Sequence, residues 1–581
     1  MKKIFTKYLH RFISAALCLA FGISLLYGCG GSDSFQEFLH DLFIEEVSSN
    51  TINLHFTLEN PESYGIKNYD ITYGDLTKES RENSISAIQE TKLKLLSYAY
   101  PALTVEEQLT YDILNDYLDT SLMLSQYYMY SEMLSPNNGL QIQLPILLAE
   151  YKFNSEQDVK DYLELLALTD EYYEQIIDFE KEKAAVGLFM SDEICQKVIE
   201  SCEAFLKTED NSFLITTFEN RLLDVDNLSE KKINQYLKKN ASILEEQFFP
   251  SYEYMIQELT NLLGNGTNDL GLCYFEKGKD YYELLVYSET GYKDSMDAIY
   301  SAIDSRRNKD LIICADLQEK DETIIDRCAS FEWEMDNPDA MLSLLQEKML
   351  NDFPKCPDTS YTISYIDESL EDYLSPAFYI TAPIDAYDEN SIYINNAHTY
   401  NDIYYFTTLA HEGYPGHLYQ TVYSYSCDLP DIRSILNYSG YVEGWATYVE
   451  YLSYDYVDTD IDITTFLSHN QSATLSLYAS SDIGIHYYGW NLDDMYNFWG
   501  SYGITDKETV KNIYEYILSE PANYLKYYVG YLGFLELKEY TKELYGSDFS
   551  LKEFHKTILE IGPAPFAIIE KYIPKYYSIK K

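Results

Sequence analysis

The chain has 581 residues, with 42 Lys or Arg against 95 Asp or Glu, so its formal net charge is −53. Nucleic-acid binding relies on basic surfaces that neutralise phosphates, and so acidic a sequence shows no basic patch, which excludes nucleic acid as a partner. A hydrophobic content of 46% and 60 Tyr supply ample core material, which excludes a largely disordered chain.

The first 28 residues have the features of a secretory signal. A basic start precedes an apolar stretch over residues 12–27, and Cys29 follows Leu26-Tyr27-Gly28 in the form of a lipoprotein cleavage box. We expect residues 1–28 to be a signal peptide, Cys29 to be lipidated and residues 29–34 to form a flexible tether. A transmembrane helix is the alternative, but the apolar run is short for one. Two acyl chains give stable anchoring, which predicts a location at the cell surface or on the periplasmic side of the membrane.

Helical patterns dominate the rest of the chain. Thr104 and Glu107 have the spacing of a capping box ahead of apolar residues at helical intervals, and Ser155 begins a similar segment. Gly562-Pro563 has the form of a helix stop. Alternating β-branched and aromatic residues occur only locally, over residues 391–395. The sequence therefore predicts a mainly α fold with a small β-sheet.

The segment from His411 to His417 combines two imidazoles with a carboxylate, Glu412. In the common H-E-x-x-H zinc motif the histidines are four residues apart and share one helix face. Here they are six apart, which on a regular helix leaves them roughly 120° out of alignment. Pro415 lacks the N–H that would bond to the His411 carbonyl, and Gly416 tolerates unusual dihedrals. We expect this Pro-Gly pair to expand the helix locally and return His417 to a position beside His411.

A later segment, residues 440–450, offers a third ligand. Glu443 would complete a His/His/Glu donor set of the kind found in catalytic zinc sites. Glu450 follows seven residues later, near the same helix face. It would either orient a metal ligand from behind or lie in solvent, and the sequence leaves both readings open.

Together, the motifs H-E-x-x-P-G-H and E-G-W-A resemble those of the bacterial domain of unknown function 885 family, whose members are similar to gluzincin-type zinc metallopeptidases. The likeness extends to residues 482–490, similar to the family's D-T-G-I-H-x-x-G-W, and to residues 521–530, similar to its P-G-Q-A-L-x-Y-K-I-G. Ile483 replaces the usual threonine in the first of these. Further departures from the family pattern bear on substrate preference more than on metal binding: Leu418, Tyr478, Asn523 and Tyr528.

The resemblance implies that His411, His417 and Glu443 bind one Zn²⁺ and that Glu412 acts as general base. It places Tyr527 and His486 in substrate-facing motifs, where we expect them to donate hydrogen bonds to the oxyanion. Arg433 matches a family arginine; it would bind a substrate carboxylate or neutralise nearby acid. The fold implied is a large helical metallopeptidase with a small sheet beside the zinc-bearing helix. We expect a helical half over residues 35–350, a zinc catalytic half over residues 351–581 and a substrate cleft between them.

The function expected from these features is zinc-dependent hydrolysis of peptide bonds outside the cytoplasmic membrane. A surface lipoprotein that binds peptides or another solute without chemistry is the alternative, although a pure binder has no need of a general base such as Glu412. Hydrolysis of a non-peptide amide is a third possibility. The sequence leaves the mode of cleavage, the side-chain preference, the pairing of cysteines and the oligomeric state open.

Overall fold

The computed structural model describes residues 34–209, 212–333, 335, 337–366, 376–398 and 403–578. The predicted signal peptide, Cys29 and all but the last residue of the tether lie outside these residues. Among the described helices, none combines the length and the apolar character that crossing a membrane requires.

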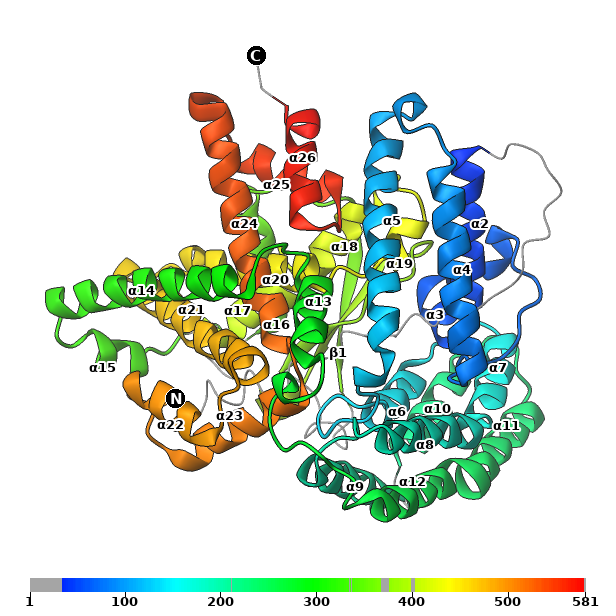
Figure 1. Cartoon of the computed structure of the whole chain (residues 1–581). Helices are drawn as coiled ribbons and strands as arrows, with labels where there is room; N and C mark the ends of the chain where they lie inside the picture. The colour runs from blue at the N-terminus through cyan, green and yellow to red at the C-terminus, as the bar shows by residue number, and fades with distance from the viewer. Residues whose placement is uncertain are drawn as a thin grey trace.

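The described part of the chain begins with four helices, which lie on one side of the molecule in Figure 1. Local capping fixes their starts. The Thr104 hydroxyl accepts a hydrogen bond from the backbone N–H of Glu107, and the Glu107 carboxylate accepts one from the backbone N–H of Thr104, which confirms the predicted capping box. The four helices are α2 (Phe35–Ser48), α3 (Thr51–Thr57), α4 (Lys78–Leu96) and α5 (Val105–Leu124).

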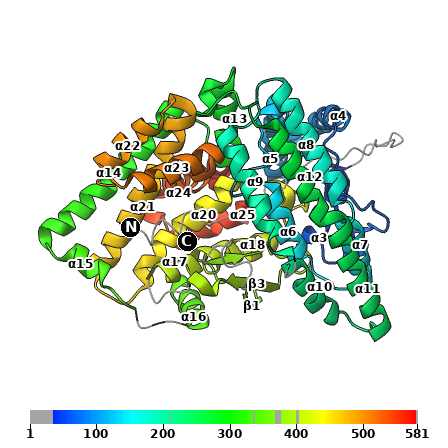
Figure 2. The same ribbon diagram turned by 90° about the horizontal axis from the view of Figure 1, so that it is seen from below.

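A second group of helices packs around its own hydrophobic cluster, built mainly from residues between 134 and 259. Figures 1 and 2 both show this group on one side of the molecule. Ser155 caps α7 as predicted. The group comprises α6 (Leu140–Glu150), α7 (Glu156–Leu166), α8 (Thr169–Ala185), α9 (Asp192–Leu206), α10 (Phe213–Leu223), α11 (Glu230–Ile243) and α12 (Phe249–Leu262).

The described strands form a single three-stranded sheet. Its order is β1-β3-β2, where β3 (Glu389–Ile394) pairs in parallel with β1 (Ser360–Tyr365) and antiparallel with β2 (Ala377–Tyr379). The predicted strand over residues 391–395 corresponds to β3. Since β2 is an edge strand that packs against α17 (Ile403–Glu412), the sheet lies directly beside the helix that carries the first candidate ligand, as expected.

The remaining helices surround this sheet and helix. α20 and α24 cross in the middle of the molecule, and α14 packs along α21 (Figure 1). The helix stop predicted at Gly562-Pro563 is confirmed, because α25 ends at Ile561. These helices are α13 (Gly278–Thr290), α14 (Met296–Lys320), α15 (Ile324–Ala329), α16 (Pro338–Met349), α18 (His417–Tyr425), α19 (Ile432–Ile435), α20 (Ser439–Ser453), α21 (Ile461–Ile483), α22 (Leu492–Ser501), α23 (Lys507–Ser519), α24 (Asn523–Tyr545), α25 (Leu551–Ile561) and α26 (Phe566–Tyr576).

The hydrophobic packing divides the chain differently from the predicted boundary between residues 350 and 351. The larger cluster joins α2–α5 and α13–α16 to the helices after residue 403, while the second cluster belongs mainly to residues 134–259. The reason is that the apolar faces of the first and middle helices are buried against the C-terminal helices, which the local periodicity of a sequence does not reveal.

Candidate metal centre

His411 and His417 lie on two consecutive helices rather than on one expanded helix. α17 ends at Glu412 and α18 begins at His417, with a cis Tyr414–Pro415 peptide between them. Gly416 is packed so tightly that a Cβ there would lie 1.8 Å from the His411 carbonyl oxygen. The prediction of one locally expanded helix is therefore wrong, because α17 ends and a second helix, α18, begins. The prediction that His417 lies beside His411 is confirmed, since the centroids of the two imidazole rings are 4.8 Å apart.

Trp445 of the E-G-W-A motif locks this break in place. Its indole Nε1 donates a hydrogen bond to the Pro415 carbonyl at 2.9 Å, and the ring is fully buried. A buried carbonyl in a non-helical bend needs such a partner. The tryptophan thus ties the helix that carries Glu443 to the turn that positions His417.

Small residues bring α20 close to α24. A Cβ on Gly444 would lie 2.4 Å from the Gly530 carbonyl carbon, and a Cβ on Gly530 would lie 2.2 Å from the Gly440 carbonyl oxygen. Only glycines allow two helix backbones to approach this closely. The crossing sets Glu443, which neighbours Gly444, near Tyr527, which lies one turn before Gly530.

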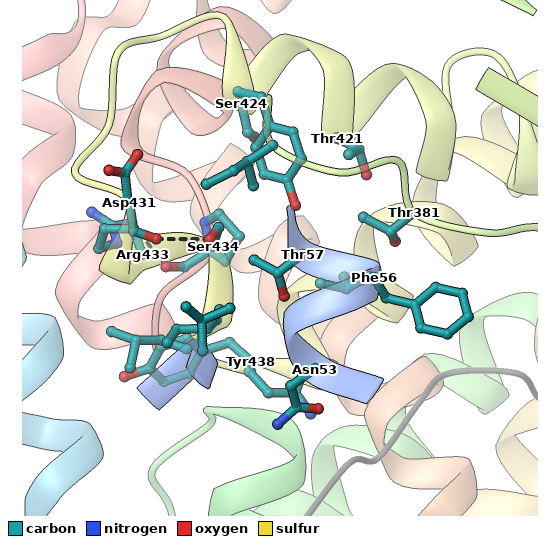
Figure 3. Close-up of a pocket in the computed structure, with 18 of the residues that line it drawn as sticks. Asn53, Phe56, Thr57, Thr381, Thr421, Ser424, Asp431, Arg433, Ser434 and Tyr438 are labelled. Atoms are coloured by element: carbon teal, nitrogen blue, oxygen red, sulfur yellow. Dashed lines mark hydrogen bonds between the residues drawn. The ribbon is translucent and has the colours of Figure 1, made fainter. Parts of the chain in front are cut away.

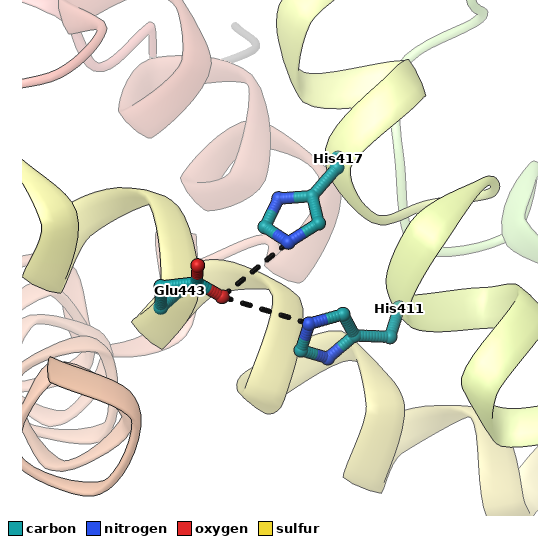
Figure 4. A group of neighbouring side chains, drawn as sticks. All are labelled: His411, His417 and Glu443. Atoms are coloured by element: carbon teal, nitrogen blue, oxygen red, sulfur yellow. Dashed lines mark ion pairs between the residues drawn. The ribbon is translucent and has the colours of Figure 1, made fainter. Parts of the chain in front are cut away.

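The three predicted ligands converge (Figure 4). Glu443 Oε2 lies 3.7 Å from His411 Nε2 and 3.4 Å from His417 Nε2, and one ligand atom from each residue lies within 4.8 Å of the others. In a tetrahedral zinc site with bonds of about 2.0–2.2 Å, ligand atoms are separated by about 3.4 Å. The donor set and its spacing therefore fit Zn²⁺ with small adjustments of side chains.

The electrostatics of Glu443 favour an ionised ligand. Burial alone raises its pKa, but the interactions with His411 and His417, assisted by the charge of Lys526, outweigh burial and hold that pKa well below its usual range. A carboxylate must be ionised to bind metal. Lys526, nine-tenths buried, is a charged neighbour of the site that the motifs did not single out.

Glu450 lies behind the first ligand and not in solvent. Its Oε2 is 3.0 Å from His411 Nδ1, and its Oε1 accepts a hydrogen bond from Gln471 Nε2 at 2.6 Å. Gln471 in turn accepts a hydrogen bond from Tyr454. All four side chains are buried. A carboxylate behind a metal-binding histidine fixes its tautomer and ring orientation. This series of hydrogen bonds therefore places the proton of His411 on Nδ1 and leaves Nε2 available as the ligand atom.

Glu412 is held from the sheet side. Its Oε2 accepts a hydrogen bond from the backbone N–H of Tyr379 on β2 at 3.1 Å, and the residue is 7% exposed. Tyr527 also lies near the first ligand, with its ring centroid 6.4 Å from that of His411. The structure therefore brings the predicted base and one predicted oxyanion donor to the ligand cluster.

The start of α24, the helix that carries Tyr527, depends on the D-x-G-I-H motif. Ala522 has a left-handed φ of 65°, and its N–H donates to Asp482 Oδ1 at 3.0 Å. The same oxygen accepts from Tyr282 at 2.6 Å. Burial raises the pKa of Asp482 to about 7. The motif therefore contributes to the site indirectly, because Asp482 fixes the start of the helix that carries Tyr527.

His486 has no N–H to offer a substrate. Its Nδ1 accepts from the backbone N–H of Leu272 at 3.2 Å, so Nε2 carries the proton and donates it to the Ile517 carbonyl at 2.9 Å. Burial lowers the pKa of His486 to about 4, which keeps the ring neutral. The expected role as an oxyanion donor is therefore wrong, because both ring nitrogens join backbone segments.

Arg433 also serves the fold. Its Nη2 donates to the carbonyls of Ile561 and Pro563, both at 2.9 Å, and burial lowers its pKa to about 10. Tyrosines, and no carboxylate, are the neighbours that oppose this shift. These contacts fasten the turn between α25 and α26 and neutralise no acid. Nε and Nη1 of Arg433 have no hydrogen-bond partner among the described residues, and Arg433 lines a pocket (Figure 3), so its binding of a substrate carboxylate stays a prediction.

Residues 59–573 match the family model of the bacterial protein of unknown function DUF885, and the chain belongs to this family. A comparison with curated proteins gives no significant match.

Two solved structures share the fold. One is a candidate lipoprotein from Colwellia psychrerythraea, 17% identical, with a TM-score of 0.82 over 94% of this chain and 100% of that one. The other is a candidate lipoprotein of unknown function from Shewanella oneidensis, 16% identical, with a TM-score of 0.65 over the same shares.

Proposed function

We propose that this protein is a zinc-dependent hydrolase of peptide bonds in oligopeptides, anchored outside the cytoplasmic membrane through a lipid on Cys29. The convergence of His411, His417 and Glu443 beside Glu412 is the observation that carries the proposal. The description of both structural relatives as candidate lipoproteins supports the anchor.

A zinc ion held by the three ligands would lower the pKa of a bound water to about 7 and polarise a peptide carbonyl. Glu412, held by the Tyr379 N–H, accepts the proton of the attacking water and passes it to the leaving amine. Tyr527 donates a hydrogen bond to the oxyanion. Glu450 keeps His411 in the tautomer whose Nε2 is free of a proton.

The proposal is tested with the detergent-solubilised full chain. Metal analysis should give one zinc per chain, and a mixed peptide pool should be cleaved, with products identified by mass spectrometry. Glu412→Gln should retain zinc and the hydrogen bond from Tyr379, because the amide oxygen replaces a carboxylate oxygen, yet lose cleavage.

Three results would count against the proposal. These are the absence of stoichiometric zinc, cleavage by Glu412→Gln at the rate of the wild type, and peptide binding that a chelator does not affect and that leads to no turnover. The last result would favour the non-catalytic binder.

A further inference from the structure

Residues 93–105, which join α4 to α5, form an apolar tip that is exposed to solvent. Leu93 and Leu96, three apart and on one face of α4, are 68% and 54% exposed, and Val105 at the start of α5 is 39% exposed. Single exposed apolar side chains are common on proteins, but no other stretch of thirteen described residues holds more than two large ones. Three smaller apolar residues of the turn are exposed as well: Ala99, Pro101 and Ala102.

The charge of the apolar tip differs from that of the rest of the protein. About one residue in six of the chain is acidic, 95 of 581, yet residues 93–105 contain no Asp or Glu and a single Lys, Lys94. Acidic residues resume on either side, at Glu90 on α4 and at Glu106 on α5. Carboxylates are repelled by an anionic lipid surface and basic residues are attracted to it. The tip therefore combines apolar exposure with the charge that a lipid surface accepts.

The apolar tip packs against the start of α2. The ring centroid of Tyr98 lies 5.2 Å from that of Phe35, the first residue of α2. Gln36 Nε2 donates a hydrogen bond to Glu107 Oε1 at 3.1 Å, just after the tip. Figure 1 shows α2, α4 and α5 on the same side of the molecule. Ser34, the N-cap of α2, therefore lies beside the tip.

The proposed lipid on Cys29 is confined to the same end of the molecule. Five residue steps separate Cys29 from Ser34. A chain spans at most about 3.6 Å per residue, so these two residues are at most about 18 Å apart. Two acyl chains on Cys29 would hold it stably at the membrane surface. The start of α2 is thereby kept within that distance of the membrane, and the apolar tip is its direct neighbour.

We infer that the apolar tip inserts into the lipid surface in which Cys29 is anchored, so that the end of the molecule formed by α2, α4 and α5 faces the membrane. The inference rests on the lipid anchor of the proposed function and not on the peptidase activity. Leu93, Leu96 and Val105 would leave water for the boundary between headgroups and acyl chains, which is favourable in proportion to the apolar area removed from water. The tip thus adds a second attachment, which fixes the orientation of the protein on the membrane.

The test uses the lipidated protein, reconstituted into phosphatidylcholine vesicles, with a tryptophan as reporter. Leu96→Trp keeps an apolar side chain at the tip. Ile312→Trp, at a 60% exposed position of α14 on the opposite side of the molecule in Figure 1, is the matched control. Bromine atoms on acyl chains quench tryptophan only at close range, so brominated vesicles should lower the emission of Leu96→Trp relative to unbrominated ones. The emission of Ile312→Trp and of the wild type, whose four tryptophans lie outside the tip, should not change.

Further variants make the result decisive. Leu93→Trp is a second reporter, so that a folding defect in one variant does not decide the outcome. Adding Leu93→Gln and Val105→Gln to Leu96→Trp should reduce the quenching, because the tip loses apolar area while the reporter stays. Quenching no stronger than that of Ile312→Trp, or quenching that survives both glutamines, would overturn the inference.

Mass spectrometry of the N-terminal peptide separates failure of the docking from failure of the anchor. A lipidated Cys29 without quenching at the tip overturns the docking and leaves the anchor in place. A Cys29 without lipid overturns the anchor, and the docking with it. Zinc content and peptide cleavage, measured on the same preparation, test the peptidase activity separately.

Discussion

Glu450 Oε2 lies 3.0 Å from Nδ1 of His411, on the side of the imidazole opposite to Glu443. The two carboxylates face the two nitrogens of one ring. This relationship assigns the proton to Nδ1 and leaves Nε2 as a metal ligand, and it depends on Gln471 and Tyr454 to hold Glu450 in place.

Gln471→Leu should weaken zinc binding although Gln471 touches no ligand atom. The change removes the hydrogen bond to Glu450 Oε1 and leaves that carboxylate free to turn from His411. Loss of support behind a metal ligand lowers affinity by about 10- to 100-fold. Competition with a chromophoric chelator measures the dissociation constant. Gln196→Leu, on the surface, should bind zinc as the wild type does; equal affinity of Gln471→Leu and the wild type would rule out this supporting role.

Gly444→Ala should disturb both stability and the site. Its Cβ would meet the Gly530 backbone at 2.4 Å, so α20 and α24 must separate. Overpacking of this kind destabilises a fold by about 1–3 kcal/mol, and here it also separates Glu443 from Tyr527. Thermal melts and zinc titrations report the two effects.

Gly500→Ala is the matched control for this change. Gly500 lies in α22 with open space around the position of its Cβ, so alanine should stabilise the helix by up to about 1 kcal/mol. If both alanines had the same effect on the melt, the close crossing of α20 and α24 would not be a determinant of the fold.

Tyr527→Phe should lower kcat while zinc content and peptide binding remain. Loss of one oxyanion donor typically reduces kcat by about 100- to 1,000-fold. Tyr365→Phe, at a tyrosine of β1 that is 57% exposed, provides the control. Steady-state kinetics on a peptide identified from the mixed pool separates kcat from KM. If the variant has a higher KM and an unchanged kcat, Tyr527 contributes to substrate binding and not to stabilisation of the transition state.

The sequence predicted which side chains converge at the candidate site, because the motifs are local. His411, Glu412 and His417 lie within seven residues, and Glu443 is the third member of a familiar donor set. The helix starts at Thr104 and Ser155 were also predicted from the sequence, since each capping box depends on two residues that are three apart. The break between α17 and α18 was not predicted, because its geometry depends on Trp445, thirty residues after Pro415.

Long-range contacts explain the other differences. His486 was expected to face substrate, yet its partners are the backbones of Leu272 and Ile517, more than 200 and about 30 residues away. Gln471 has no motif of its own, and only the folded chain places it on Glu450. A helical glutamine facing a buried acid on another helix leaves no signal in a single sequence.

Because burial raises the pKa of Asp482, this residue should lower the free energy of unfolding as pH rises. Its folded pKa is about 7, above the usual 3.8 of an aspartic acid. The unfolded chain therefore loses this proton first. As pH rises above 3.8 the folded state becomes progressively less favoured, and the decline is complete once pH passes about 7. The slope in this window is about 1.4 kcal/mol per pH unit.

The stability difference between Asp482→Asn and the wild type isolates this effect from other titrating groups. Buried histidines act in the opposite direction: His55, with a pKa lowered to about 3, destabilises the fold as pH falls below 6.5, and it is present in both proteins. From pH 5 to pH 8 the asparagine variant should gain about 2–3 kcal/mol relative to the wild type, measured by urea unfolding. Asp41→Asn, on the exposed face of α2, should show no such change. A constant difference between Asp482→Asn and the wild type across this range would mean that Asp482 is already ionised when it holds the Ala522 N–H at neutral pH.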